Sequence, residues 1–77
     1  MSDILKQLFS EVLSVDVSSL DEESSPDTID EWDSLAAMML VSAIETKFQV
    51  QLSTRDIMKM STIGLARQSL RGRGVDV

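Results

Sequence analysis

The sequence predicts an all-α fold, a small four-helix bundle of three longer helices and one short helix, with a long loop between helices 1 and 2. Apolar residues recur at helical spacing in separate segments. Each segment begins beside a serine, threonine or aspartate, the residue types that cap helices. Residues 49–52 have some strand character, but the sequence shows no second segment that could pair with them as a strand. With 77 residues there is no room for a second core, so we expect a single domain over residues 1–77.

The first helix is predicted by pairs of apolar residues spaced four positions apart. The pairs are Ile4 with Leu5, Leu8 with Phe9, and Val12 with Leu13. This spacing places one apolar stripe along an amphipathic helix. Ser2 or Asp3 has the side chain needed to cap its first turn.

A long acidic segment, residues 16–33, follows this helix. It holds eight carboxylates, no basic residue, Pro26 and several serines, which is the composition of a loop. It exceeds the ~12–15 residues usual for a structureless connection, so we expect it to be functional or to contain a short turn. Four apolar residues are expected to pin it to the core: Val15, Val17, Leu20 and Ile29.

The second helix is predicted from about Ser34 to about Phe48, with Asp33 or Ser34 as its N-cap. On a wheel of 100° per residue its core stripe consists of Ala37, Leu40, Val41, Ile44 and Phe48. The opposite side carries Leu35, Met39, Ser42 and Thr46, flanked by Ala36, Met38 and Ala43. A helix that only covered a core would usually expose charge there, so we expect Leu35 and Met39 to form a partner-binding surface. For Met38 the sequence leaves core packing and partner binding open.

Two further helices complete the predicted bundle. Ser53 or Thr54 can cap a brief helix over residues 55–60. Thr62 begins a last helix that points Ile63, Ala66 and Leu70 inward. Gly72 and Gly74 are expected to end it.

The composition argues against several classes of function. There is no cysteine and no histidine, so the chain has no thiolate metal site and no serine–histidine triad. We therefore expect neither an enzyme nor a metal site. No window approaches the ~20 apolar residues of a membrane span, and no signal peptide is recognisable. We expect a soluble, cytoplasmic monomer that does not bind membranes.

Charge is unevenly distributed along the chain. Residues 1–45 hold eleven acidic residues and one basic residue, whereas residues 46–77 hold six basic and two acidic residues. The negative front half repels nucleic acid and favours partners with basic surfaces. The basic residues near the end are Arg67, Arg71 and Arg73. They suit the dipole of the last helix, and we expect no nucleic-acid partner.

Ser34 stands at the start of the apolar second helix, beside Asp33. A phosphate esterified to its hydroxyl would lie where free backbone N–H groups and the helix dipole favour an anion. The residues by themselves favour a serine that only caps the helix, which is the usual role of a serine at such a position.

The arrangement of several motifs resembles an acyl carrier protein over nearly the whole chain. The motifs are the acidic loop, Asp33-Ser34-Leu35, then Leu40-Val41, Ile44, Glu45 and Phe48, Leu52, and the run at residues 61–64. The resemblance implies a phosphoprotein whose Ser34 carries 4′-phosphopantetheine, attached from coenzyme A by a phosphopantetheinyl transferase. The thiol of that arm then carries the cargo as a thioester, which would explain a carrier without cysteine.

The same resemblance implies that partner enzymes read the second helix. The positions that partners typically contact are Asp33, Leu35, Met38, Met39 and Glu45. The implied partners are acyl- or aminoacyl-loading enzymes and downstream transferases or synthases. Where primary fatty-acid carriers place several acids along this helix, this chain has Ala36, Met39 and Lys47. With Trp32 and the arginine-rich end, these departures favour a dedicated carrier in a specialised pathway of lipid or polyketide type.

Two alternatives remain beside this interpretation, and a third is rejected. An aminoacyl or peptidyl carrier of a nonribosomal-peptide-type pathway would have the same serine and a different cargo. A cofactor-free helical interaction domain would keep every contact after Ser34→Ala. A calcium-binding loop over residues 27–38 is rejected, because Trp32 replaces the required glycine and Met38 the required glutamate.

Overall fold

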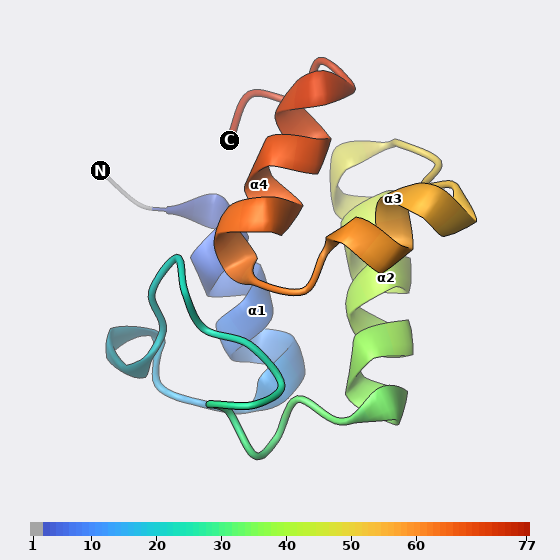
Figure 1. Ribbon diagram of the computed structural model, residues 1–77. Helices are drawn as coiled ribbons and strands as arrows, with labels where there is room; N and C mark the ends of the chain where they lie inside the picture. The colour runs from blue at the N-terminus through green and yellow to red at the C-terminus, as the bar shows by residue number, and fades with distance from the viewer. Residues whose placement is uncertain (1–2) are drawn as a thin grey trace.

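A computed structural model describes residues 3–77, and over these residues it contains helices and their connections only (Figure 1). In chain order the elements are α1 (Ile4–Leu13), the 3-10 turn η1 (Val17–Ser19), α2 (Ser34–Phe48), α3 (Thr54–Lys59) and α4 (Ile63–Gly72). The predicted all-α bundle of three longer helices and one short helix is confirmed. Of the two alternatives for the acidic loop, a functional role or a short turn, the turn is present as η1.

Each helix begins at a cap that the sequence predicted. The caps are Asp3 for α1, Asp33 for α2, Ser53 for α3 and Thr62 for α4. In each case a side-chain oxygen accepts a backbone N–H three residues further on. These bonds satisfy amides that have no acceptor inside the helix. Ser2, the alternative cap of α1, lies outside the described residues.

Helix ends are less uniform than helix starts. Ser14 after α1 and Gln49 after α2 adopt the left-handed conformation, at φ 57° and 56°. Polar residues tolerate this conformation better than branched ones. Gly72 is the last residue of α4, and Gly74 follows at φ 85°, so the predicted end of this helix is confirmed.

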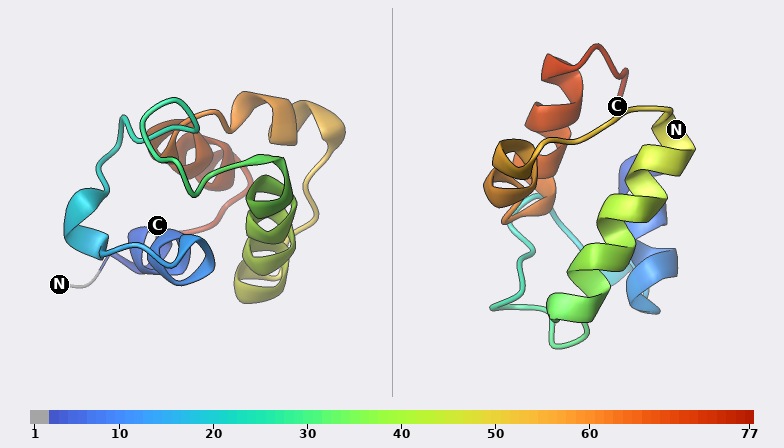
Figure 2. Two further views of the ribbon diagram at one scale, coloured as in Figure 1. Left: turned by 90° about the horizontal axis from the view of Figure 1, so that it is seen from below. Right: turned by 90° about the vertical axis from the view of Figure 1, so that its right-hand side faces the viewer.

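The three longer helices, drawn from two directions in Figure 2, surround one apolar core. The helical core residues are Leu5, Phe9 and Leu13 from α1, Ala36, Leu40 and Ile44 from α2, and Ile63, Ala66 and Leu70 from α4. Helix α1 packs against both α2 and α4. The inward residues predicted for the last helix are confirmed.

Two packing predictions were wrong. Ala36 was expected beside the outer face of α2, but it is buried, because the helix turns its 36–40–44 row toward the core. Val17 was expected to pin the loop, but it is exposed on η1, whereas Leu20 is buried. Trp32, for which no core role was predicted, is buried and packs edge-on against Phe9 with ring centroids 5.2 Å apart.

The acidic loop is docked onto the first turn of α4 through its backbone. The N–H of Gly64 donates to the carbonyl of Glu22 at 2.9 Å, and the N–H of Ile63 donates to that of Ser24 at 3.2 Å. A Cβ at position 64 would lie 3.0 Å from the Glu22 carbonyl oxygen. Glycine therefore allows a close approach that any other residue would obstruct.

Arg67 joins three parts of the chain. Its guanidinium lies 2.7 Å from a carboxylate oxygen of Asp3, at the cap of α1, and 2.7 Å from one of Glu22 in the loop. The hydrogen bond from Arg67 lowers the pKa of Glu22. Burial raises the pKa of Asp3, but the bonds from Arg67 and from the Lys6 N–H outweigh burial and leave it below its ordinary value. This cluster holds the loop and the start of α1 against α4.

Candidate functional site

Ser34 is the first residue of α2 and is exposed to solvent. The cap of the helix is Asp33 instead: its Oδ1 accepts the Ala36 N–H at 2.8 Å, and its carbonyl accepts the Ala37 N–H at 2.9 Å. No hydrogen bond within residues 3–77 engages the Ser34 hydroxyl. The sequence left open whether Ser34 or Asp33 caps the helix, and the structure assigns that role to Asp33.

The residues around Ser34 fit a phosphate ester on its hydroxyl. The backbone N–H groups of Ser34 and Leu35 belong to the first turn, where a helix supplies no acceptor. The dipole of a 15-residue helix adds partial positive charge at the same end. The site thus combines an open hydroxyl, free backbone donors and a field that favours an anion.

The outer face of α2 is exposed where the sequence predicted a binding surface. Leu35, Met38 and Met39 have 68%, 72% and 51% of their surface exposed. For Met38, whose place the sequence left open, this exposure excludes simple core packing. Partner binding by these three residues stays a prediction.

Met38 and Met39 border different hollows on the two sides of α2. Met38 lines a groove of about 370 Å³ between α2 and α3, together with Val41 and Ile57. Met39 lines a groove of about 550 Å³ between α1 and α2, together with Leu8. Consecutive residues of a helix point about 100° apart, and in the fold the two methionines offer two separate apolar surfaces.

Glu45, predicted to contact partners, has a structural contact as well. It lines the groove between α2 and α3, and its Oε2 accepts the Leu52 N–H at 2.9 Å. This bond fixes the connection between α2 and α3 across seven residues. No helical periodicity signals such a contact, because it joins a helix to the segment that follows its end.

A small pocket of about 40 Å³, partly open to solvent, lies beside the α2–α3 groove. The two share Ala37, Val41 and Ile57, and Trp32 and Phe9 line the pocket from the core side. The Trp32 indole therefore takes up interior volume beneath the groove.

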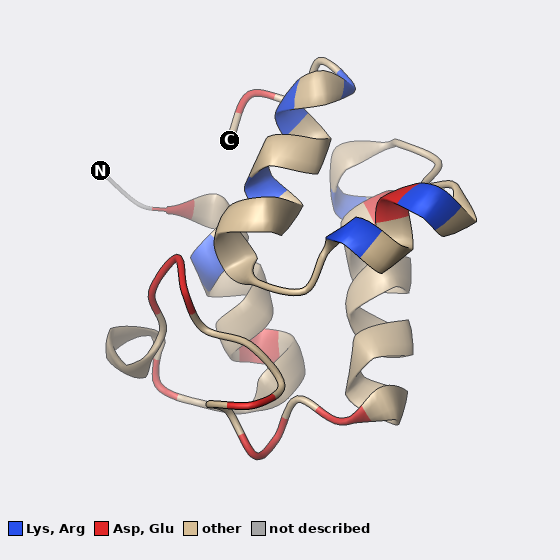
Figure 3. Cartoon of the chain, in the orientation of Figure 1, with Lys and Arg blue, Asp and Glu red and all other residues tan. Residues whose placement is uncertain are grey.

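The site lies in an acidic part of the molecule. Figure 3 shows the acidic residues along the loop that leads to α2, and most of the basic residues on α3 and α4. Asp30, Glu31 and Asp33 precede Ser34 and are exposed. Within residues 3–77 no group of three or more acidic side chains is arranged to hold a metal ion. No helix among these residues is long and apolar enough to cross a membrane.

Comparison with known proteins identifies one family. The family model described as "Phosphopantetheine attachment site" matches residues 3–65. The matched span runs from the cap of α1 through the acidic loop, Ser34 and α2 to the first turn of α4. A search of curated proteins finds no match.

Proposed function

The chain belongs to the phosphopantetheine attachment family, and we propose that Ser34 is the residue to which its 4′-phosphopantetheine is attached. Members of this family are non-catalytic carriers that hold the group covalently. They interact with a phosphopantetheinyl transferase and with the enzymes of a pathway. The observation that carries the proposal is the position of Ser34, exposed at the start of α2 and not needed as its cap. When bound, the group supplies a thiol that holds an acyl cargo as a thioester. Residues 1–77 act in this proposal as one carrier domain.

The neighbours of Ser34 have separate roles in the proposal. Asp33 holds the first turn of α2 through its cap, so the Ser34 backbone is fixed while its hydroxyl stays accessible. Its carboxylate also offers charge to a basic surface on the transferase. Leu35 is exposed beside the serine and offers an apolar contact to the same partner.

For the pathway, we favour a cytoplasmic carrier dedicated to a specialised fatty-acid or polyketide-type system. Lys47 and Met39 are exposed on α2 where primary fatty-acid carriers place acids. Ala36, the third departure from those carriers, is buried and offers nothing to a partner. Partner recognition should then depend more on apolar contact than on charge.

The first experiment is intact mass after incubation with coenzyme A and a broad-specificity phosphopantetheinyl transferase. We expect one phosphopantetheine on the wild type and none on Ser34→Ala. Ser42→Ala is the matched control, because Ser42 is an exposed serine of the same helix. No addition to a folded wild type, or addition to Ser34→Ala, would refute attachment at Ser34.

Asp33 is tested with two variants that separate its cap from its charge. Asp33→Ala removes both and should cost about 1 kcal/mol of stability. Asp33→Asn keeps a capping side chain and removes the charge. We expect both to slow modification of Ser34, measured as the initial rate of mass gain. A wild-type rate for Asp33→Asn would leave Asp33 with the capping role only.

The cargo is tested on the modified protein. A housekeeping malonyl transferase should load it poorly if the carrier is dedicated, and efficient loading would count against that. Adenylating enzymes offered amino acids and fatty acids then separate the two kinds of carrier. Transfer of amino acids alone would replace the acyl carrier proposal by the aminoacyl alternative.

A further inference from the structure

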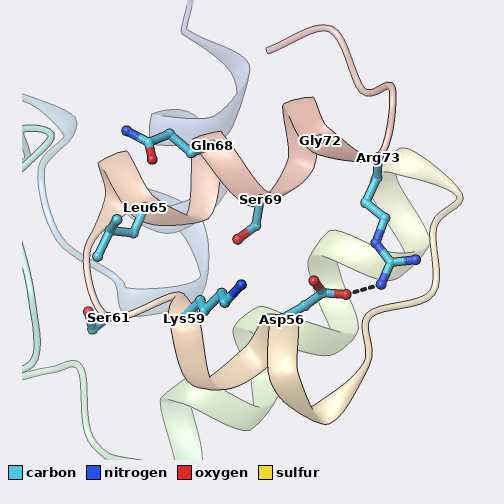
Figure 4. Close-up of a pocket in the computed structure, with 8 residues that line it drawn as sticks. All are labelled: Asp56, Lys59, Ser61, Leu65, Gln68, Ser69, Gly72 and Arg73. Carbon is cyan, nitrogen blue, oxygen red and sulfur yellow. Dashed lines mark hydrogen bonds and ion pairs between the residues drawn. The ribbon is translucent and has the colours of Figure 1, made fainter.

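A cleft between α3 and α4 takes no part in the carrier role described above. It has a volume of about 520 Å³ and lies between Asp56 and Lys59 on α3 and the row of Leu65, Gln68, Ser69 and Gly72 on α4 (Figure 4). Most of these side chains are polar. The opposite face of α4 packs into the core, so this row is not needed to hold the helix in place.

The region around the cleft is the basic part of an acidic protein. Residues 54–73 hold five of the chain's seven basic residues and a single acid, Asp56. Arg67 is bound to Asp3 and Glu22, and Arg73 pairs with Asp56. Lys59 in the cleft and Arg55 on the same helix have no ion pair within residues 3–77, and both are exposed.

The cleft offers donors and an apolar contact together. Lys59 supplies an ammonium group, and the Ser69 hydroxyl on the facing helix points toward it, whereas the Gln68 amide points away from both, as Figure 4 shows. Leu65 is exposed at the same surface. An open cleft of this kind suits a chain that lies along it better than a small molecule that must be enclosed.

We propose that the α3–α4 cleft docks an extended acidic segment of a partner protein. One carboxylate of the segment is held by Lys59 and its neighbouring donors, and an apolar side chain next to it packs on Leu65. The rest of the surface carries an excess of acids and repels such a segment, so charge directs it to this cleft.

The cleft is separate from the candidate site on α2. Ser34 begins α2 at the lower end of that helix in Figure 1, whereas α3 and α4, which line the cleft, lie above it, and the right-hand view of Figure 2 agrees. A partner held at the cleft can therefore leave Ser34 accessible. This inference rests on the proposed function only in taking the partner to be an enzyme that uses the carrier.

The test is a titration of the ¹⁵N-labelled chain with a synthetic peptide, Glu-Glu-Leu-Glu-Glu, observed by amide chemical shifts. We expect shifts centred on Lys59, Ser61 and Ser69, and weaker binding when salt is raised from about 20 mM to about 200 mM. The peptide Gln-Gln-Leu-Gln-Gln should not bind. Shifts of similar size from the neutral peptide, or from inorganic phosphate at the same concentration, would refute docking of an acidic segment.

Two charge-reversal variants test whether the acidic peptide binds at the cleft. Lys59→Glu should lower the affinity for the acidic peptide by about ten-fold or more. Lys47→Glu, at an exposed lysine on α2, should leave this affinity unchanged. An equal loss of peptide affinity in both variants would show general electrostatic attraction rather than binding at the cleft, and would overturn the proposal. Thermal melting checks that both variants fold. Modification of Ser34 in Lys59→Glu is scored separately, so failure of the carrier role and failure of the cleft give different results.

Discussion

Helices α2 and α4 both contribute three buried residues to the core, but they differ in what they expose. Helix α4 buries Ile63, Ala66 and Leu70 and carries mainly polar or charged residues on its other sides. Helix α2 also exposes Leu35, Met38 and Met39. Apart from Leu65, which is exposed at the α3–α4 cleft, the apolar residues of α4 are explained by the core. The core does not explain α2, whose exposed apolar residues point to contact with other proteins.

The largest expected effect compares one leucine from each helix. Leu70→Ala empties a fully buried position and should lower the free energy of unfolding by about 3 kcal/mol. Leu35→Ala should change it by less than about 0.5 kcal/mol. Urea unfolding followed by the fluorescence of Trp32, the single tryptophan, measures both. Equal losses would mean that Leu35 serves the fold, and the contrast between the helices would disappear.

The next effect concerns how α4 holds the rest of the chain. Arg67→Met removes its charged hydrogen bonds to Asp3 and Glu22 and should cost about 1–2 kcal/mol, since the two carboxylates stay partly hydrated. Arg55→Met, at an exposed arginine, should cost less than about 0.5 kcal/mol. The same unfolding measurement compares them. If Arg67→Met and Arg55→Met were equally stable, the docking of the loop would depend on the backbone hydrogen bonds of Gly64 and Ile63 alone.

A smaller effect is expected at the exposed methionines. Met38→Gln and Met39→Gln should leave stability unchanged and lower kcat/KM of a partner enzyme by up to about ten-fold, or about 1.4 kcal/mol. Because they border different grooves, one partner should respond to one methionine more than to the other. Ile4→Gln, on the exposed side of α1, is the control. If both methionine variants showed wild-type kinetics with every partner enzyme, the hypothesis that the exposed methionines of α2 bind partners would be wrong.

The smallest effect is the pH dependence of stability. The pKa values of Asp3 and Glu22 lie below their ordinary 3.8 and 4.5 in the folded chain, so the folded state binds fewer protons than the unfolded state in acid. Their contribution to the free energy of unfolding is fully present above the ordinary pKa values. It is lost as the pH falls through the lowered pKa values of the folded chain. The stability difference between wild type and Arg67→Met should therefore shrink from about pH 6 to about pH 3. The pKa values of Asp16 and Asp56 are lowered by local backbone bonds that Arg67→Met leaves intact, so they do not affect this difference.

Local chemistry allowed the helices and the candidate serine to be predicted from the sequence. A cap and an apolar repeat act over three or four residues, so the start of α2 was predicted at Asp33 or Ser34 and that of α4 at Thr62. The Asp33-Ser34-Leu35 motif is likewise contiguous. An exposed serine at a helix start follows from these residues without knowledge of the partners in the core.

Only the tertiary structure decided how the helices are turned and what holds the loop. A helical wheel does not set rotation to within one residue, which is why Ala36 is buried and its neighbour Ala37 is only partly buried. Burial of Trp32 depends on Phe9, 23 positions earlier, and the loop depends on Gly64 and Arg67, more than 40 positions later. Contacts at such separations leave no periodic signal in a sequence. They arise when packing brings distant segments together, and they decide here which side of α2 is left for partners.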